Sequence, residues 1–380
     1  MKLQLFYVGI SHKSAPLSIR ARLQVSVGDI SAMLAWLGDL VPERMILSTC
    51  ERFEIYALAA DCKASTWITP LAEWFGVSGE LLSRYVRLLH GDAVAEHLFR
   101  VAAGLESRII GEPHILGQVR DAFLEATSTV RASGAGGASG LRSIGPILDA
   151  LARSAIHTGK RVRSETPINV GARSVVTIAL KHVEHALGTV RGRTILIVGT
   201  GSLASDIAAG LASRQVSKII IASRSVDRAS ALARKCHGAG LALEQLTEGL
   251  GRSDAVVTCS RAGVVINRST VGEVAGRRLY ILDLGVPRNV HASVGQLPGV
   301  RLSHIDELLS RESARPESHE ANHIVALELA RFLQWQRERE VASIIAKQVR
   351  RLRASDVPDA RTRNRALHAQ IMRIKAGVAA

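Results

Sequence analysis

A short apolar run leads directly into a glycine-rich turn near the middle of the chain, and this join constrains the fold more than any other feature. The segment reads RTILIVGTGSLAS, and residues 199–204 follow the pattern G-x-G-x-x-A. A buried strand, a tight glycine turn and an Ala-rich helix form the start of a βαβ unit whose helix N-terminus can bind a pyrophosphate. The context therefore predicts a dinucleotide-binding domain. The residues expected to bind the cofactor are Gly199, Gly201, Ser202, Leu203 and Ala204.

The end of the next apolar run indicates which dinucleotide is bound. The run KIIIAS ends in Ser223, followed by Arg224 and Ser225. In domains that bind NAD, an acidic residue at this place holds the ribose 2′-hydroxyl. A guanidinium and two hydroxyls instead suit a 2′-phosphate, which favours NADPH over NADH. The alternative is that Arg224 is an ordinary surface arginine in a loop.

The order of the other apolar runs predicts the architecture. DAVVTCS and LYILDLG continue the strand–helix alternation of a doubly wound sheet. Nearer the N-terminus, LQLFYVGI, MILSTC and FEIYALAA have the pattern of strands, with a helix at 30–40 and helical patterns up to about residue 129. The glycine- and serine-rich stretch 133–140 is expected to be an exposed loop. From about residue 305 the pattern is helical.

These patterns predict an α/β multidomain protein, since a chain of 380 residues exceeds the usual size of one core. We expect an N-terminal α+β catalytic domain over residues 1–155 and a Rossmann-like NADP-binding domain over residues 156–305. Residues 306–380 are expected to form a long helix leading to a short helical dimerisation region.

Charge and composition limit the function classes. The net charge is +15, and residues 331–380 hold twelve Lys and Arg against four Asp and Glu. A positive field attracts polyanions, so nucleic-acid binding and a solvated basic surface are both open. The sequence has no apolar run long enough for a membrane span and no signal-peptide pattern. The four cysteines form no CxxC pair, which argues against a metal site or a disulfide framework and fits a cytoplasmic protein.

Cys50 is the candidate nucleophile. It lies between two strand-like runs in ILSTCERFEIYA, among polar neighbours that include Arg52. A nearby guanidinium favours the reactive thiolate, and His97 is the best candidate for an accompanying proton shuttle. A thiolate can attack an activated acyl group, and a nicotinamide hydride can reduce the resulting thioester to an aldehyde. The alternative is that Cys50 is a structural thiol.

Five motifs together resemble the glutamyl-tRNA reductase family over most of the chain. GISHKSAPLSIRARL resembles that family's opening, and LSTCERFEIYA resembles its L-S-T-C-N-R-x-E-x-Y signature. HLFRVAAGLESRIIGEPHILGQVRDAF resembles its long block around G-E-P-Q-I-L-G-Q-V. LIVGTGSLAS and LDLGVPRNV resemble its cofactor and strand-end motifs.

The resemblance implies an activity and partners. Members reduce glutamyl-tRNA with NADPH to glutamate-1-semialdehyde, the first step of tetrapyrrole synthesis from glutamate, and no metal takes part. It also implies a homodimer and a product that can pass to an aminotransferase.

The same resemblance implies roles for individual residues. Cys50 would form the thioester, Arg52 would hold the carboxylate of the substrate side chain, and His97 would assist proton transfer. Thr49 and Ser107 would contact the aminoacyl group. The remaining substrate-binding positions of the block are Glu112, His114 and Gln118. For His12 and Glu54 the alternative is a purely structural role in which they tie loops together.

Several positions depart from the family pattern. Glu51 replaces an Asn next to the nucleophile, and Glu106, His114 and Ser223 replace an Asp, a Gln and an Asn. A carboxylate at residue 51 would raise a thiol pKa and repel an acidic substrate. Two alternatives therefore stay open: a paralogue that reduces another aminoacyl-tRNA, and a regulator that binds tRNA or NADPH without turnover. A small-molecule dehydrogenase of the shikimate type is less favoured, because it would not need Cys50.

Overall fold

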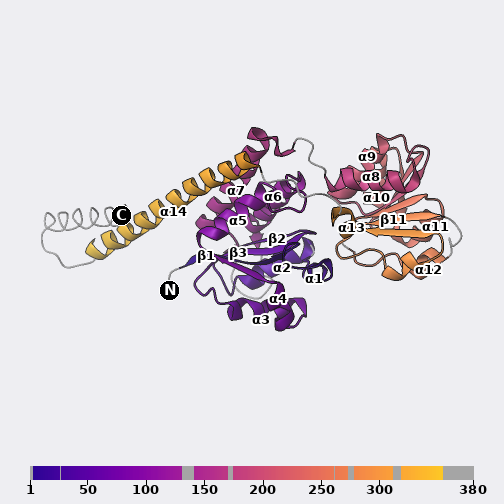
Figure 1. The fold of residues 1–380 in the computed structure, drawn as a ribbon. Helices are drawn as coiled ribbons and strands as arrows, with labels where there is room; N and C mark the ends of the chain where they lie inside the picture. Colours follow the sequence, from indigo (N-terminus) through magenta and orange to yellow (C-terminus); the bar gives the residue numbers. More distant parts are fainter. Residues whose placement is uncertain are drawn as a thin grey trace.

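The computed structural model describes residues 3–25, 27–130, 141–169, 174–260, 262–272, 278–310 and 318–353. The chain forms an N-terminal α+β domain, a second α/β domain and one long C-terminal helix whose far end extends away from them (Figure 1). This arrangement confirms the predicted multidomain α/β class. The loop expected at 133–140 and the expected dimerisation region beyond residue 353 lie outside the described residues.

The N-terminal domain is built on a four-stranded antiparallel sheet with strand order β2-β3-β1-β4. The strands are β1 (Gln4–Ser11), β2 (Glu43–Ser48), β3 (Arg52–Ala59) and β4 (Arg87–His90). The first three confirm the strands predicted from the sequence. The fourth corrects the helical assignment of that segment. β4 is only four residues long, and its pairing with the edge of β1, which no local pattern reports, determines its conformation.

Alternation along β1 divides the domain into two layers. Phe6 and Val8 face a core formed with α2, α3 and α4, whereas Leu5 and Tyr7 face a core formed with α5, α6 and α7. The helices of this domain are α1 (Leu17–Arg22), α2 (Val27–Leu37), α3 (Ala64–Phe75), α4 (Gly79–Tyr85), α5 (Asp92–Ala102), α6 (His114–Thr127) and α7 (Pro146–Glu165). A short pair, β5 (Thr129–Val130) and β6 (Leu141–Arg142), follows α6. The boundary expected at 155/156 falls inside α7, whose Ala155 and Val162 both pack in the N-terminal core.

The second domain contains a six-stranded parallel sheet with strand order β12-β11-β10-β7-β8-β9, which confirms the doubly wound prediction. Its strands are β7 (Thr194–Val198), β8 (Lys218–Ser223), β9 (Ala239–Ala242), β10 (Ala255–Thr258), β11 (Leu279–Asp283) and β12 (Val300–His304). Its α-helices are α8 (Val175–Leu187), α9 (Ser202–Ala212), α10 (Val226–Lys235), α11 (Leu246–Gly251), α12 (Arg268–Gly272) and α13 (Ile305–Ser310). Residues of α8, α9, α10 and α13 cover one face of the sheet, and residues of α11 and α12 cover the other.

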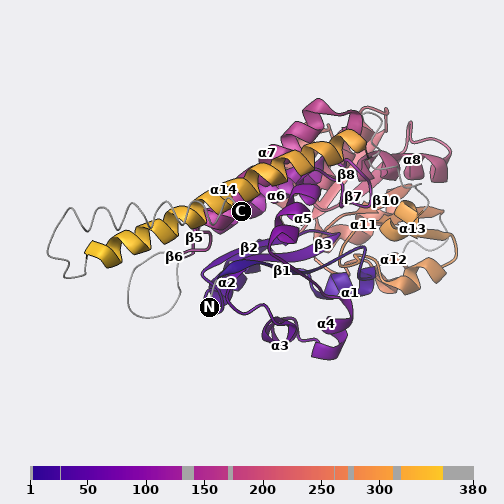
Figure 2. The same ribbon diagram turned by 60° about the vertical axis from the view of Figure 1, so that its left-hand side comes forward.

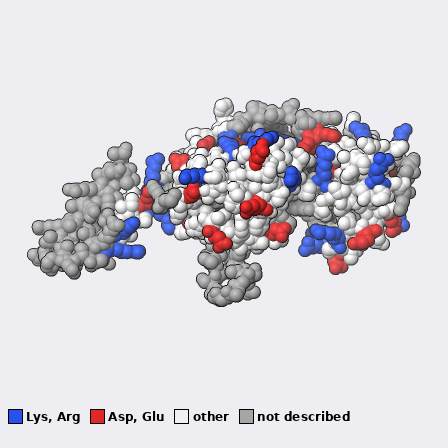
Figure 3. Space-filling view, turned by 90° about the horizontal axis from the view of Figure 1, so that it is seen from below, with Lys and Arg blue, Asp and Glu red and all other residues white. Residues whose placement is uncertain are grey.

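The long helix α14 (His319–Arg353) returns to the N-terminal domain after the second domain ends. It lies along α5 and α7 (Figures 1 and 2), where Ile324 and Phe332 pack into the core and Arg161 pairs with Glu328 at 2.6 Å. None of the helices in the described ranges is long and apolar enough to cross a membrane. On the face shown in Figure 3, Lys and Arg are interspersed with Asp and Glu over both domains.

Candidate active site

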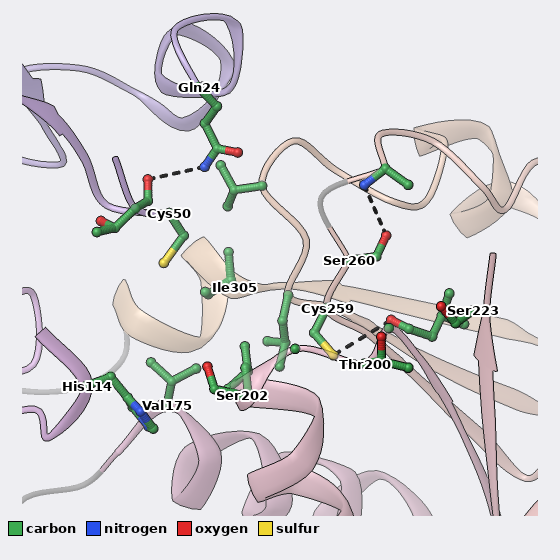
Figure 4. A pocket seen from close by; sticks show the side chains of 18 of the residues that line it. Gln24, Cys50, His114, Val175, Thr200, Ser202, Ser223, Cys259, Ser260 and Ile305 are labelled. Carbon is green, nitrogen blue, oxygen red and sulfur yellow. Dashed lines mark hydrogen bonds between the residues drawn. The ribbon is translucent and has the colours of Figure 1, made fainter. Parts of the chain in front are cut away.

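A cavity of about 910 Å³ lies where the two domains meet, and residues of both domains line it (Figure 4). The sequence-predicted residues that line it are Thr49, Cys50, Arg52, Glu112, His114, Gln118, Gly199, Gly201, Ser202, Leu203, Ser223, Arg224 and Ser225. The structure thus brings Cys50 and the glycine turn, which are far apart in the sequence, to one cavity. His97, Ser107 and Ala204 do not line it.

The turn that carries Cys50 is held by its own hydrogen bonds. Thr49 N donates to Arg52 O at 2.8 Å, and Thr49 Oγ1 accepts from the backbone N of Glu51 and of Arg52, each at 3.2 Å. Gln24 Nε2 donates to Thr49 O at 3.2 Å (Figure 4). Because the turn between β2 and β3 is bonded on both sides, the Cys50 side chain is presented to the cavity from a fixed position.

Arg52 lies in a buried ionic network beneath this turn. Its Nη1 lies 2.9 Å from Glu54 Oε1, and its Nη2 donates to Glu106 O at 2.6 Å. Glu54 also accepts from Tyr56 Oη at 2.6 Å and lies 3.1 Å from His97 Nε2. Burial alone would raise the pKa of Glu54, but the charges of Arg52 and His97 lower it to about 2. His97 therefore lies behind Arg52, and Glu54 is the centre of the network.

Two buried polar atoms near this network have no hydrogen-bond partner in the described part of the chain. They are Arg52 Nε and Ser107 Oγ, on side chains of residues that are 2% and 5% exposed. An unpaired buried donor is costly, so such atoms commonly await a ligand or water. For Arg52, which lines the cavity, this observation fits the substrate-contact role that the resemblance implies, whereas Ser107 lies outside the cavity.

Two carboxyl groups lie on the cavity wall near Cys50. Glu51 Oε2 accepts from Arg108 N at 3.2 Å and lies 3.6 Å from His12 Nδ1. Burial lowers the pKa of His12 to about 4, so this imidazole is neutral near pH 7. Glu112 is half-buried, and burial together with the charge of Glu51 raises its pKa to about 7. Near neutral pH the Glu112 carboxyl is therefore partly protonated.

Two of the other departures from the family pattern, Glu106 and His114, have charged partners. Glu106 is held by Lys13 Nζ at 2.5 Å and Arg100 Nε at 2.9 Å, so its carboxylate pairs with two cations of its own domain. His114 Nε2 lies 3.7 Å from Asp206 Oδ2 of α9, across the domain junction. The described residues contain no group of three or more His, Cys, Asp or Glu side chains that could hold a metal ion.

The glycine turn requires glycine at its first position. Gly199 has φ of +130°, and a Cβ there would lie 3.1 Å from Cys259 O. The backbone after β7 can therefore approach β10 closely, and the N-terminus of α9 faces the cavity. Ala204 is fully buried against the sheet, which is the packing role of the third position in such motifs.

The loop after β8 carries the residues that fit a 2′-phosphate. Ser225 caps α10 by accepting from Arg228 N at 3.4 Å, and Arg228 lines the cavity together with Arg224. Sequence reasoning missed Arg228. Its position four residues after Arg224, in the first turn of a helix capped by Ser225, was the signal that could have found it. The acidic residues of the cavity wall, Glu51 and Glu112, belong to the other domain. Two guanidinium groups and two hydroxyls at this end therefore fit a phosphate.

The parallel domain with its glycine turn shares a cavity with a cysteine-bearing domain, an arrangement that fits an oxidoreductase with a dinucleotide cofactor. Residues 8–166 match the N-terminal domain of glutamyl-tRNAGlu reductase, and residues 181–310 match the shikimate / quinate 5-dehydrogenase family. The chain belongs to the glutamyl-tRNA reductase family.

Two solved structures show the extent of the similarity. Glutamyl-tRNA reductase from Methanopyrus kandleri is 29% identical, with 99% of this chain and 93% of that chain covered and a TM-score of 0.50. The nucleotide-binding domain of glutamyl-tRNA reductase from Thermoplasma volcanium is 25% identical, with 37% of this chain and 91% of that chain covered and a TM-score of 0.30.

Proposed function

We propose that the protein reduces glutamyl-tRNA to glutamate-1-semialdehyde with NADPH, through a thioester at Cys50. The observation that carries this proposal is that Cys50 and the glycine turn at 199–202 line one cavity. A nucleophile and a hydride donor must act on the same carbon atom, so their sites have to share a space.

The first step is acyl transfer to the protein. The Cys50 sulfur attacks the ester carbonyl carbon, the bond to the ribose oxygen breaks, and that oxygen leaves with a proton. We assign the proton to Glu112, which lines the cavity and has a pKa of about 7, close to the value that suits a general acid at neutral pH. His97 reaches the cavity only through Glu54, so its proposed role is to keep Arg52 in position.

The second step releases the aldehyde. When bound, NADPH supplies the hydride that reduces the acyl carbon; the carbon–sulfur bond then breaks and the Cys50 thiolate is restored. The glycine turn would hold the pyrophosphate, and Arg224 and Arg228 would hold the 2′-phosphate. Burial and the charge of Asp283 raise the pKa of Cys259 to about 12, so this second thiol stays protonated and does not compete as a nucleophile.

The choice of amino acid depends on Arg52. Its Nε has no hydrogen-bond partner among the described residues and is the group proposed to bind the substrate carboxylate, whereas Nη1 and Nη2 already contact Glu54 and Glu106. Glu51 and Glu112 lie on the same wall, and their carboxyl groups would repel an acidic substrate side chain. This favours a second candidate, a paralogue acting on another aminoacyl-tRNA. Glu51 is held by the Arg108 amide, which reduces its repulsion of an acidic substrate.

The family resemblance also supports two partner proposals. The first is a homodimer. The second is transfer of the aldehyde to a glutamate-1-semialdehyde aminotransferase, which would consume the product.

A single-turnover assay with a panel of charged tRNAs tests the proposed function. The protein is mixed with NADPH and each aminoacyl-tRNA, and the aldehyde products are trapped and identified. Reduction of glutamyl-tRNA supports the main proposal, and reduction of a different aminoacyl-tRNA supports the paralogue. If no aminoacyl-tRNA is reduced, both proposals are wrong and a binding role is favoured.

A further inference from the structure

One carboxylate of the second domain is held by two arginines of the first. Asp306 lies at the start of α13, and its Oδ1 is 2.7 Å from Arg108 Nη1 and 3.5 Å from Arg20 Nη2. The Arg20 side chain is 5% exposed and that of Arg108 is 22% exposed. The Asp306 carboxylate therefore forms an electrostatic contact between the domains. Because the two guanidinium groups are largely buried, salt screens this contact less than it screens an ion pair on the surface.

Both arginines are also tied to the turn that carries Cys50. Arg20 donates through Nη1 to Cys50 O and through Nε to Ala15 O at 3.2 Å, so each of its nitrogens has a distinct partner. The backbone N of Arg108 donates to Glu51 Oε2 at 3.2 Å. Asp306 is therefore connected through Arg20 to Cys50 and through Arg108 to Glu51.

The helix that carries Asp306 is packed into the nucleotide-binding domain. Leu308 and Ile305 of α13 are buried in the core of that domain. The Ile305 side chain also lines the cavity close to Cys50 (Figure 4). The position of Asp306 relative to Arg20 and Arg108 thus sets how close this wall of the cavity comes to the nucleophile.

We propose that Asp306 is a positioning residue that holds the nucleotide-binding domain against the Cys50 turn for the hydride-transfer step. This inference rests on the proposed function. Acyl transfer to Cys50 needs residues of the first domain alone, whereas reduction of the acyl group needs both domains in contact. Loss of the Asp306 charge therefore slows reduction and leaves acyl transfer unchanged.

The test separates the two half-reactions. Protein is first mixed with labelled aminoacyl-tRNA without NADPH, and the acyl group bound to Cys50 is measured over time. NADPH is then added, and the loss of that acyl group to aldehyde is followed. We expect Asp306→Asn to acylate within about twofold of the wild-type rate and to reduce the acyl group about tenfold more slowly. NADPH affinity, measured by fluorescence titration, is expected to be unchanged.

Three further variants sharpen the result. Asp306→Glu is expected to recover part of the reduction rate, because it keeps the charge. Asp306→Asn combined with Arg108→Ala is expected to be no slower than the slower single variant, because both changes break one contact. The control is Glu248→Gln, which removes an ion pair with Arg252 inside the second domain and is expected to behave as wild type.

Two results would overturn the inference. One is that Asp306→Asn reduces the acyl group at the wild-type rate, and the other is that it slows both half-reactions equally, which indicates a folding defect. Failure of the proposed function is distinct, because the wild-type protein would then form no acyl group on Cys50 from any aminoacyl-tRNA.

Discussion

Arg52 and Glu54 form an ion pair of 2.9 Å in which the side chains are 1% and 0% exposed, directly beneath the turn that carries Cys50. A buried pair of this kind adds little net stability compared with apolar residues, but loss of one partner leaves an uncompensated charge. The pair therefore makes the position of Arg52 depend on Glu54.

Replacing Glu54 is expected to destabilise the fold. In Glu54→Gln the Arg52 guanidinium stays buried without its counter-charge, which costs about 3–5 kcal/mol in the free energy of unfolding. Denaturant unfolding measures this loss. The control is Glu80→Gln, which removes a pair with Arg84 on the protein surface and is expected to be neutral. Equal stability of the two variants would show that the buried pair is unimportant.

The pH dependence of the free energy of unfolding is expected to report the raised pKa of Glu112. Its pKa is raised to about 7, so it binds its proton more tightly in the folded state than in the unfolded state. Below about pH 4.5 this proton contributes its full stabilisation, about 1–3 kcal/mol in the free energy of unfolding. That contribution is lost as the pH rises through about 7. Unfolding free energies of the wild type and Glu112→Gln from pH 4 to pH 8 should therefore differ in slope. Parallel curves would contradict the raised pKa.

Substitution of the nucleophile is expected to separate chemistry from cofactor binding. Cys50→Ser should abolish formation of the acyl adduct and aldehyde, because a serine hydroxyl is a far weaker nucleophile than a thiolate. NADPH affinity should stay the same, since Gly199 and Arg224 lie on the other domain. Cys62→Ser, in which the thiol lies outside the cavity, is the control and should keep full activity. An active Cys50→Ser variant would rule out the thioester.

Removal of the proposed 2′-phosphate contacts is expected to change cofactor preference. Arg224→Ala and Arg228→Ala should each remove charge-assisted hydrogen bonds of roughly 1.5–3 kcal/mol, which corresponds to about 10- to 100-fold weaker NADPH binding. NADH lacks that phosphate, so its affinity should change little. Fluorescence titration with both cofactors measures the difference. Equal losses for NADPH and NADH would contradict the assignment.

The sequence by itself determined the parts of the protein that depend on local patterns. Alternation placed β1, β2 and β3, and the glycine turn placed the start of α9, because side-chain period and backbone freedom are properties of neighbouring residues. The motif around Cys50 located the turn for the same reason. Local patterns also located Ser223, Arg224 and Ser225 at the end of β8, where the structure has them.

Only the tertiary structure decided the contacts between distant residues. The sequence offered for Glu54 only a role in connecting loops, yet its partners Tyr7 and His97 come from another strand and from α5. Arg20 and Asp306 are separated by 286 positions and meet only because the two domains pack together. The reach of a side chain is a few ångströms in space, while the sequence reports only separation along the chain. Which charges neutralise one another was therefore decided by packing.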